Sequence, residues 1–228
     1  MRLVQYPAKN QWDKLVARPV NSTKQINKLV KPLLKQVRKK GDEALFKLTS
    51  KFDKVNLQSF EVSSEEIKEA VTLVDDKLKE AIQIASRNIR KFHEAQLTTE
   101  KPIETTKGVK CWRKSVGIEK VGLYVPGGTA PLFSTVLMLA IPATIAGCKE
   151  IILCSPPNIE GKLHPAILYA ANLSGVTKIF KVGGAQAIAA MAFGTESIPK
   201  VSKIFGPGNQ FVTACLLYTS PSPRDDIS

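Results

Sequence analysis

Three neutral polar side chains stand beside glycine-containing turns in the second half of the sequence: Tyr124 precedes Pro126-Gly127-Gly128, Gln186 follows Gly183-Gly184, and Asn209 follows Gly206-Pro207-Gly208. A phenol can stack or form a hydrogen bond, and a carboxamide can both donate and accept. Together these groups suit the ribose, amide or adenine edges of a small-molecule ligand. Each of them alone is also typical of a residue that caps a turn, and the sequence leaves both interpretations open.

The turns belong to a repeated pattern of strand, turn and helix. Four apolar segments each end in a turn that contains Gly or Pro and precede a helical pattern: "VGLYV", "KEIILCS", "TKIFKV" and "VSKIF". This alternation predicts βαβ units, so the predicted fold class is α/β, with a helical N-terminal region followed by a mostly parallel, Rossmann-like sheet. Ligands of such sheets bind beyond the carboxyl ends of the strands, where the three polar residues are expected.

The glycines of these turns allow two interpretations. Glycine lets a ligand approach the backbone, and the free N–H groups of the helix behind it suit a phosphate. Strand-to-helix turns also need glycine for structural reasons. The common nucleotide motifs are absent, because "GPGNQF" carries Phe211 at the third glycine position of GxGxxG and no GxxxxGK[ST] occurs. Any nucleotide site must therefore be of another type.

The first hundred residues have helical periodicity. Apolar residues over 26–37 form a stripe that breaks at Gly41, and Pro32 either kinks this helix or marks its first turn. Ser63 and Glu66 have the spacing of a capping box. The pattern then predicts an amphipathic helix over 75–97, and alternation predicts a hairpin or two short strands over 108–125. We expect the helical region to be scaffold and subunit contact.

The composition is typical of a globular protein with reduced thiols. Of 228 residues, 43% are hydrophobic and 23% charged, and the net charge of +13 comes mostly from residues before 121. These cations alternate with acidic residues and no nucleic-acid motif accompanies them, so a solvated face is expected rather than a nucleic-acid partner. Nucleic-acid binding would require an affinity that falls steeply with salt. The four cysteines have no CxxC or zinc-ligand spacing.

A membrane-spanning or exported protein is not predicted. Residues 121–148 carry no charged side chain and are long enough to span a bilayer, but several prolines and glycines interrupt them, and a broken helix leaves backbone groups unpaired in lipid. The start, "MRLVQYPAKNQW", lacks the apolar core of a signal peptide. The sequence therefore predicts a cytoplasmic protein with no membrane partner.

Long segments of the chain closely resemble the histidinol dehydrogenase family. They are "GDEALFKLTSKFD", "VGLYVPGGTAPLFSTVLMLAIPATIAGCKEIILCSPP" and "VGGAQAIAAMAFGTESIPKVSKIFGPGNQFVT", and the likeness runs to about Ala214. The resemblance implies an NAD- and zinc-dependent oxidoreductase that converts L-histidinol through L-histidinaldehyde to L-histidine in histidine biosynthesis. It implies a cytoplasmic homodimer, and it matches Tyr124, Gln186 and Asn209 to the family's NAD-contacting positions.

The same resemblance implies that the catalytic and zinc-binding residues lie beyond the end of this chain. The family's Gly-Pro-Ser-Glu segment, its Gln/His pair, its later Asp and His ligands and its Glu-His pair do not occur here. We therefore expect no catalytic and no metal-binding residue in this chain. His93, inside a helical pattern, and His164, before Pro165, are expected to have structural or surface roles.

These patterns predict three regions. Residues 1–107 form the helical N-terminal part of the first domain, and residues 108–214 form an α/β NAD-binding region. Residues 215–228, "CLLYTSPSPRDDIS", lose the pattern and form an anomalous tail of foreign sequence or a natural disordered tail. The leading hypothesis is a fragment of a histidinol dehydrogenase that is inactive alone; the alternative is a non-catalytic nucleotide-binding or interaction module.

Overall fold

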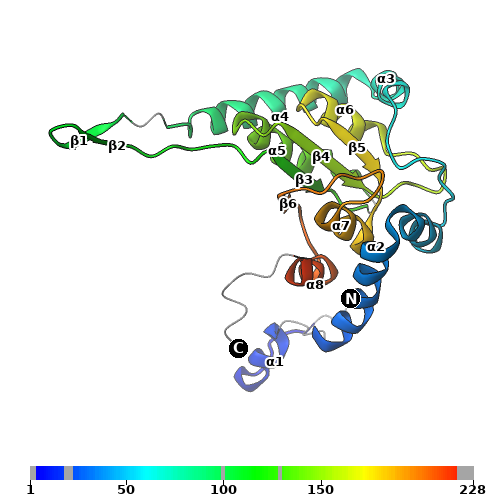
Figure 1. The fold of residues 1–228 in the computed structure, drawn as a ribbon. Coiled ribbons are helices and arrows are strands. Elements are labelled where there is room, and N and C mark those ends of the chain that lie inside the picture. Colours follow the sequence, from blue (N-terminus) through cyan, green and yellow to red (C-terminus); the bar gives the residue numbers. More distant parts are fainter. Residues whose placement is uncertain (1–3, 18–22, 99–100, 128–129, 220–228) are drawn as a thin grey trace.

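The computed structural model describes residues 4–17, 23–98, 101–127 and 130–219 (Figure 1). Gly128 of the first predicted turn and residues 220–228 of the predicted tail lie outside the described residues. The N-terminal part is helical, as predicted, with elements η1 (Lys9–Gln11), α1 (Trp12–Val16), α2 (Thr23–Phe52), α3 (Ser64–Leu73) and α4 (Asp76–Glu94). A hairpin follows, made of β1 (Ile103–Thr106) and β2 (Val109–Cys111).

The remainder alternates strands and helices, which confirms the predicted α/β class. The elements are β3 (Lys120–Tyr124), α5 (Phe133–Ile145), β4 (Glu150–Ser155), α6 (Pro165–Leu173), β5 (Lys178–Lys181), α7 (Gly184–Phe193), β6 (Lys203–Phe205) and α8 (Gln210–Thr219). The sheet is parallel with strand order β5-β4-β3-β6. This order is that of one half of a doubly wound sheet, in which the chain first moves outward and then returns past its first strand.

Helices cover both faces of this sheet (Figure 1). On one face α2, α7 and α8 pack together, and on the other α4 and α3 pack over α5 and α6. Each face has its own buried apolar cluster, and Tyr124 belongs to the α2 side. The N-terminal helices therefore complete both cores, which explains why their apolar stripes are conspicuous in the sequence. The division at residue 108 stays a prediction.

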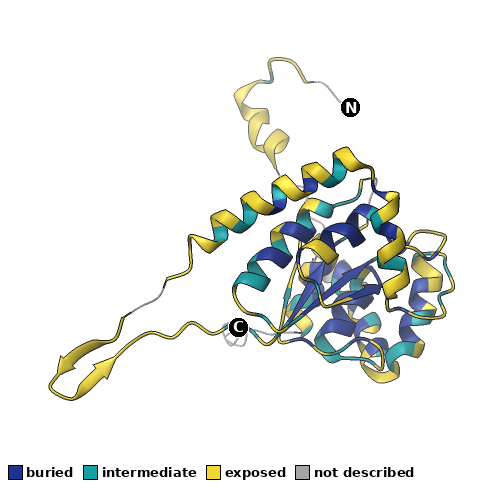
Figure 2. Cartoon of the chain, turned by 90° about the horizontal axis from the view of Figure 1, so that it is seen from above, coloured by how far each residue is buried: buried dark blue, intermediate teal, exposed yellow. Residues whose placement is uncertain are grey.

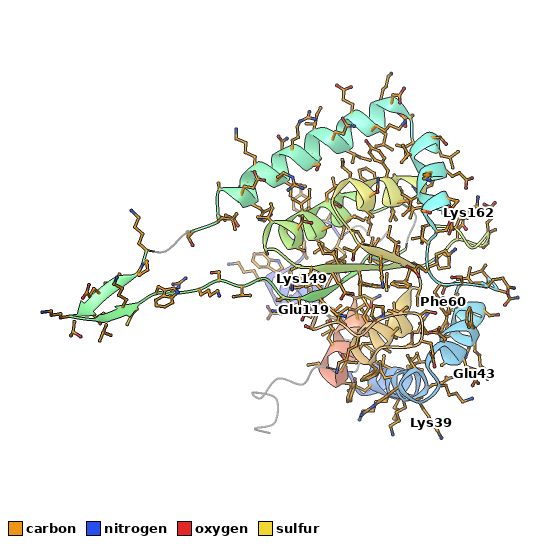
Figure 3. The ribbon with its side chains drawn as sticks, turned by 45° about the horizontal axis from the view of Figure 1, so that its top comes forward. Lys39, Glu43, Phe60, Glu119, Lys149 and Lys162 are labelled. Atoms are coloured by element: carbon orange, nitrogen blue, oxygen red, sulfur yellow. The ribbon has the colours of Figure 1, made fainter. Side chains whose placement is uncertain are left out.

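One sheet edge is covered by the segment after α2. Lys181 N donates to Phe60 O at 2.8 Å, and Val62 N donates to Ile179 O at 2.9 Å, so residues 60–62 pair with β5. Phe60 is fully buried beside this edge, where Figure 3 labels it. Covering an edge strand removes unpaired backbone groups that would otherwise invite association.

The predicted break at Gly41 is a kink inside α2. Gly41 has φ 51° and ψ −130°, and a Cβ there would lie 2.2 Å from Glu196 Oε2. The same oxygen accepts a hydrogen bond of 2.7 Å from Asp42 N, so Glu196 caps the second half of the helix. Pro32 lies within the first half. Glycine is favoured here because side chains rarely tolerate this positive φ, and because a Cβ would displace the Glu196 carboxylate that caps the helix.

The predicted capping box at Ser63 and Glu66 is confirmed. Its carboxylate has a second partner that local sequence does not reveal, since Glu66 Oε1 also lies 3.0 Å from Lys181 Nζ. Lys181 is only 8% exposed, and Glu66 gives its buried ammonium group a counter-charge. Glu66 thus joins the start of α3 to the end of β5.

Glu66→Gln tests this pairing. The amide still accepts from Ser63 N but leaves Lys181 without a counter-charge, so we expect a loss of about 1.5 kcal/mol in the free energy of unfolding, measured by urea denaturation. The matched control is Glu69→Gln on the same helix, whose partner Lys162 is half exposed (Figure 3). That variant should lose less than about 0.5 kcal/mol. Equal losses in the two variants would show that the buried Glu66–Lys181 pair contributes no more to stability than the exposed Glu69–Lys162 pair.

The β1–β2 hairpin projects from the body and is exposed throughout (Figure 2). Of the two alternatives predicted for residues 108–125, the two short strands are present as β2 and β3, whereas the hairpin pairs β2 with β1, which lies before that range. Large apolar side chains on and near it are exposed, including Trp112 and Val116. None of the helices in the described part of the chain is both long and apolar enough to span a membrane.

The end of the described chain differs from the predicted pattern. α8 continues through Thr219, so the predicted boundary after residue 214 falls inside a helix. Cys215 is fully buried and belongs to the core on the α2 side. Helical contact with α2 and α7 therefore orders residues that show no clear pattern in the sequence.

Candidate functional site

The carboxyl ends of β3 and β6 meet where the strand order reverses. Tyr124 is the last residue of β3 and Gly206 directly follows β6. The two approach so closely that a Cβ on Gly206 would lie 2.4 Å from the Tyr124 carbonyl oxygen. Open α/β sheets bind ligands at such a reversal, because the loops diverge there and leave a crevice.

The Tyr124 side chain turns from β3 toward the start of α7. Its hydroxyl oxygen accepts a hydrogen bond of 3.1 Å from Gly184 N. Tyr124 is 5% exposed, and burial raises the pKa of the phenol; the Gly184 hydrogen bond lowers it in part, and nearby Asp53 adds to the rise. The phenol therefore stays neutral. Its O–H proton has no acceptor within the described part of the chain and can serve a ligand.

Gln186 lies at the same turn. Its side chain folds back over Gly184, since a Cβ on Gly184 would lie 2.8 Å from Gln186 Oε1. Gln186 is 2% exposed, so its carboxamide is held in a fixed place. The structure thus brings two of the three sequence-predicted residues, Tyr124 and Gln186, to the same glycine turn.

Asn209 has a different position. Its Oδ1 accepts from Phe211 N at 3.0 Å and from Val212 N at 3.2 Å, so this side chain caps α8. It also lines a hollow of about 490 Å³ between α2 and α8. None of its hydrogen bonds within the described residues goes to Tyr124 or Gln186, and the residue of this loop that approaches Tyr124 is Gly206, three positions earlier. The oxygen of Asn209 thus caps a helix, which is one of the two roles that the sequence allowed, while its NH₂ group remains able to donate to a ligand.

The expectation of free helix N–H groups at these turns needs correction. Gly184 N at the start of α7 donates to Tyr124, and two N–H groups of α8 donate to Asn209. Side chains have therefore taken donors that a phosphate would use.

Two of the glycines have a packing role. Pro156, in the turn after β4, fills the space beside both neighbouring turns. A Cβ on Gly127 would lie 2.6 Å from Pro156 Cγ, and one on Gly183 would lie 2.3 Å from Pro156 Cβ. The three turns therefore pack closely against one another. This packing alone explains why Gly127 and Gly183 are glycines, without any role in ligand binding.

Asp53 is a residue near this site that pattern analysis missed. It directly follows α2, and its Oδ2 is buried without a hydrogen-bond partner in the described part of the chain. Burial raises its pKa to about 6. The signal in the sequence is an acidic residue at the C-terminal end of a long helix, where the helix dipole disfavours negative charge.

A second hollow, of about 540 Å³, lies at the same sheet edge on the opposite face. The turns after β3 and β4 and the starts of α3 and α6 line it, with Glu69, Lys162 and His164 at its rim. None of the three predicted residues lines it. We place the candidate site at the β3–β6 reversal instead, because buried polar side chains with unused hydrogen-bonding capacity converge there.

The remaining reactive groups have structural surroundings. His164 caps α6, its Nδ1 accepting from Ala166 N at 3.2 Å, and His93 stacks edge-on against Phe92 in the last turn of α4. Burial raises the pKa of the Cys154 thiol strongly and that of Cys215 to about 11, so neither is a ready nucleophile. In the described ranges no three His, Cys, Asp or Glu side chains gather closely enough to hold a metal ion. These residues do not fit a zinc site.

Comparison with known proteins decides the family. The sequence profile of histidinol dehydrogenase matches residues 16–219. This chain belongs to the histidinol dehydrogenase family. The family resemblance seen in the sequence is confirmed, and the match reaches the end of α8.

Individual members of the histidinol dehydrogenase family agree with this assignment. The histidinol dehydrogenase of Bacteroides thetaiotaomicron is 59% identical over 214 residues, which are 94% of this chain and 50% of that protein. That of Escherichia coli K12 is 52% identical over 89% of this chain and 46% of its own length. The crystal structure of histidinol dehydrogenase from Elizabethkingia anophelis superposes with a TM-score of 0.86 at 52% identity, covering 93% of this chain and 49% of that one. The chain thus spans about half the length of these relatives.

Proposed function

We propose that this chain forms the NAD-binding part of a cytoplasmic, homodimeric enzyme that oxidises L-histidinol to L-histidine through L-histidinaldehyde. Family membership supports the reaction. The observation that carries the binding role is the hydrogen bond from Gly184 N to the Tyr124 hydroxyl, because it fixes a phenol with a free O–H at the sheet reversal.

Each of the three residues has a defined task in this proposal. Tyr124 donates its O–H to a ribose or amide oxygen, the Gln186 carboxamide both donates and accepts, and the Asn209 NH₂ group donates from the loop after β6. When bound, NAD supplies the hydride acceptor for the alcohol and then for the hydrated aldehyde. Zinc and the proton-transferring groups of the reaction are assigned to no residue in the described part of this chain.

Gln186→Leu tests the proposal. Titration of NAD⁺ into the purified 228-residue chain by calorimetry should give saturable binding, and the variant should bind about fivefold more weakly because a leucine keeps the bulk and loses the hydrogen bonds. The matched control is Gln83→Leu, a glutamine of α4 on the opposite face that donates to the Tyr169 hydroxyl at 2.9 Å. Absence of binding by the native chain, or an equal loss in the control, would contradict the assignment.

A further inference from the structure

Asp53 occupies a position that costs stability. Its N–H donates to Thr49 O at 2.8 Å and so continues the last turn of α2, and Lys54 then leaves the helix with φ 57°. A carboxylate at this end of a helix faces the partial negative charge of the unpaired carbonyl groups. A left-handed φ at a residue other than glycine adds strain. Neither feature improves the fold.

The polar groups of this helix face also lack partners. Within the described residues four buried side-chain atoms have no hydrogen bond, and two of them, Asp53 Oδ2 and Thr49 Oγ1, lie one helical turn apart. Thr49 is only 1% exposed. Asp53 takes part in none of the ion pairs between described residues, and burial raises its pKa. Buried polar groups are normally paired, so an unpaired cluster calls for an explanation outside the fold's own contacts.

Asp53 lies close to the candidate site. The Asp53 carboxylate lies near enough to Tyr124 for its charge to raise the pKa of that phenol, although the two do not form a hydrogen bond. α2 packs along α7, the helix that carries Gln186. A free phenol O–H, a carboxamide and a carboxylate thus lie on the same face of the sheet, where α2 and α7 pack. The carboxylate can only accept, so its natural ligand presents hydroxyl donors.

We infer that Asp53 is a further ligand-binding residue of this site, whose carboxylate accepts hydrogen bonds from the vicinal hydroxyls of a ribose and thereby selects NAD over NADP. This inference rests on the proposed NAD-binding function. A ribose diol supplies the two O–H donors that an unpaired carboxylate needs. A 2′-phosphate would remove one donor and place negative charge against the carboxylate, in the way that an acidic residue disfavours NADP in dinucleotide-binding sheets. Here the acidic residue comes from the helix that precedes the sheet.

The test compares Asp53→Asn with the native 228-residue chain. Calorimetric titration should show NAD⁺ binding about tenfold more weakly to the variant, and the preference for NAD⁺ over NADP⁺ should shrink by a similar factor. Asp76→Asn is the matched charge control, because Asp76 is exposed in α4 on the opposite face of the sheet. The affinities of this control variant for NAD⁺ and NADP⁺ should stay within twofold of the native values.

Thermal melting without ligand separates a binding role from a structural one. At pH 7.5 Asp53→Asn should raise the melting temperature by about 2–4 °C, because it removes the charge from a half-buried carboxylate whose Oδ2 has no partner. The folded-state pKa lies above the ordinary value of 3.8, so the charged form destabilises the fold above about pH 6 and the gain should vanish as the pH falls toward 4. The other titratable groups around Tyr124 are the thiols of Cys154 in β4 and Cys215 in α8, which are uncharged over this range.

The outcomes are distinct. If the native chain binds NAD⁺ and Asp53→Asn binds it within twofold, or if that variant melts lower than the native chain, the inference is overturned and the proposed function stands. If the native chain does not bind NAD⁺, both the proposed function and the inference about Asp53 are contradicted. Weaker NAD⁺ binding together with a higher melting temperature supports both.

Discussion

Tyr124→Phe is expected to weaken NAD⁺ binding by about 30-fold, equivalent to about 2 kcal/mol. The variant keeps the ring in the core and removes only the hydroxyl, which has two roles. The oxygen holds the α7 turn through Gly184 N, and the O–H is free for the ligand. Losing the first role also leaves a backbone N–H without its partner, so the free energy of unfolding should fall by about 1.5 kcal/mol. Calorimetry and urea denaturation measure the two effects.

Tyr169→Phe is the matched control for this variant. Tyr169 is also buried and its hydroxyl also accepts a single hydrogen bond, from Gln83 Nε2 at 2.9 Å, but it lies in α6 on the other face of the sheet. It should lose about 1 kcal/mol of stability and leave NAD⁺ affinity unchanged. A comparable loss of affinity in both variants would mean that Tyr124 acts only through general stability.

Gly206→Ala is expected to lower the free energy of unfolding by about 3 kcal/mol. The added Cβ would lie 2.4 Å from the Tyr124 carbonyl oxygen and 3.0 Å from Tyr124 Cβ. The oxygen cannot retreat easily, because β3 is paired with β4 on one side and β6 on the other. Relief of the clash must separate the ends of β3 and β6, so NAD⁺ affinity should fall as well. Urea denaturation gives the first quantity and calorimetry the second.

Gly147→Ala controls for the general cost of replacing a glycine. Gly147 ends the turn after α5 with φ 80°, and a Cβ there would meet no atom within 4 Å. Only backbone strain opposes that substitution, so about 1 kcal/mol should be lost and ligand binding should not change. A Gly206→Ala variant no less stable than Gly147→Ala would refute the close approach of β3 and β6.

Features that depend on neighbouring residues in the chain were predictable from the sequence. The capping box at Ser63 and Glu66, the break at Gly41 and the strand–turn–helix alternation are all present. Each follows from local hydrogen bonding, backbone freedom or apolar periodicity, which a short window of sequence contains. The same logic placed Tyr124 and Gln186 at turns on one edge of the sheet.

Features that depend on chain segments far apart were not predictable in this way. The Lys181–Glu66 pair and the Tyr124–Gly184 hydrogen bond join residues 115 and 60 positions apart. They exist because β3 lies between β4 and β6 and because residues 60–62 cover β5, which local patterns do not specify. Asp53 was missed for the same reason, since burial beside Tyr124 becomes visible only when α2 is packed on α7. The helix through Thr219 likewise depends on tertiary contact.

Backbone amide NMR of the ¹⁵N-labelled 228-residue chain during titration with NAD⁺ tests the binding site most directly. We expect saturable shifts of the Gly184 amide, which donates to Tyr124, and of the Phe211 amide, which donates to Asn209. The amides of Gly108 in the projecting hairpin and Gly147 after α5 should remain unchanged. Shifts at the hairpin without any at Gly184, or no shifts at saturating NAD⁺, would contradict an NAD site at the β3–β6 reversal.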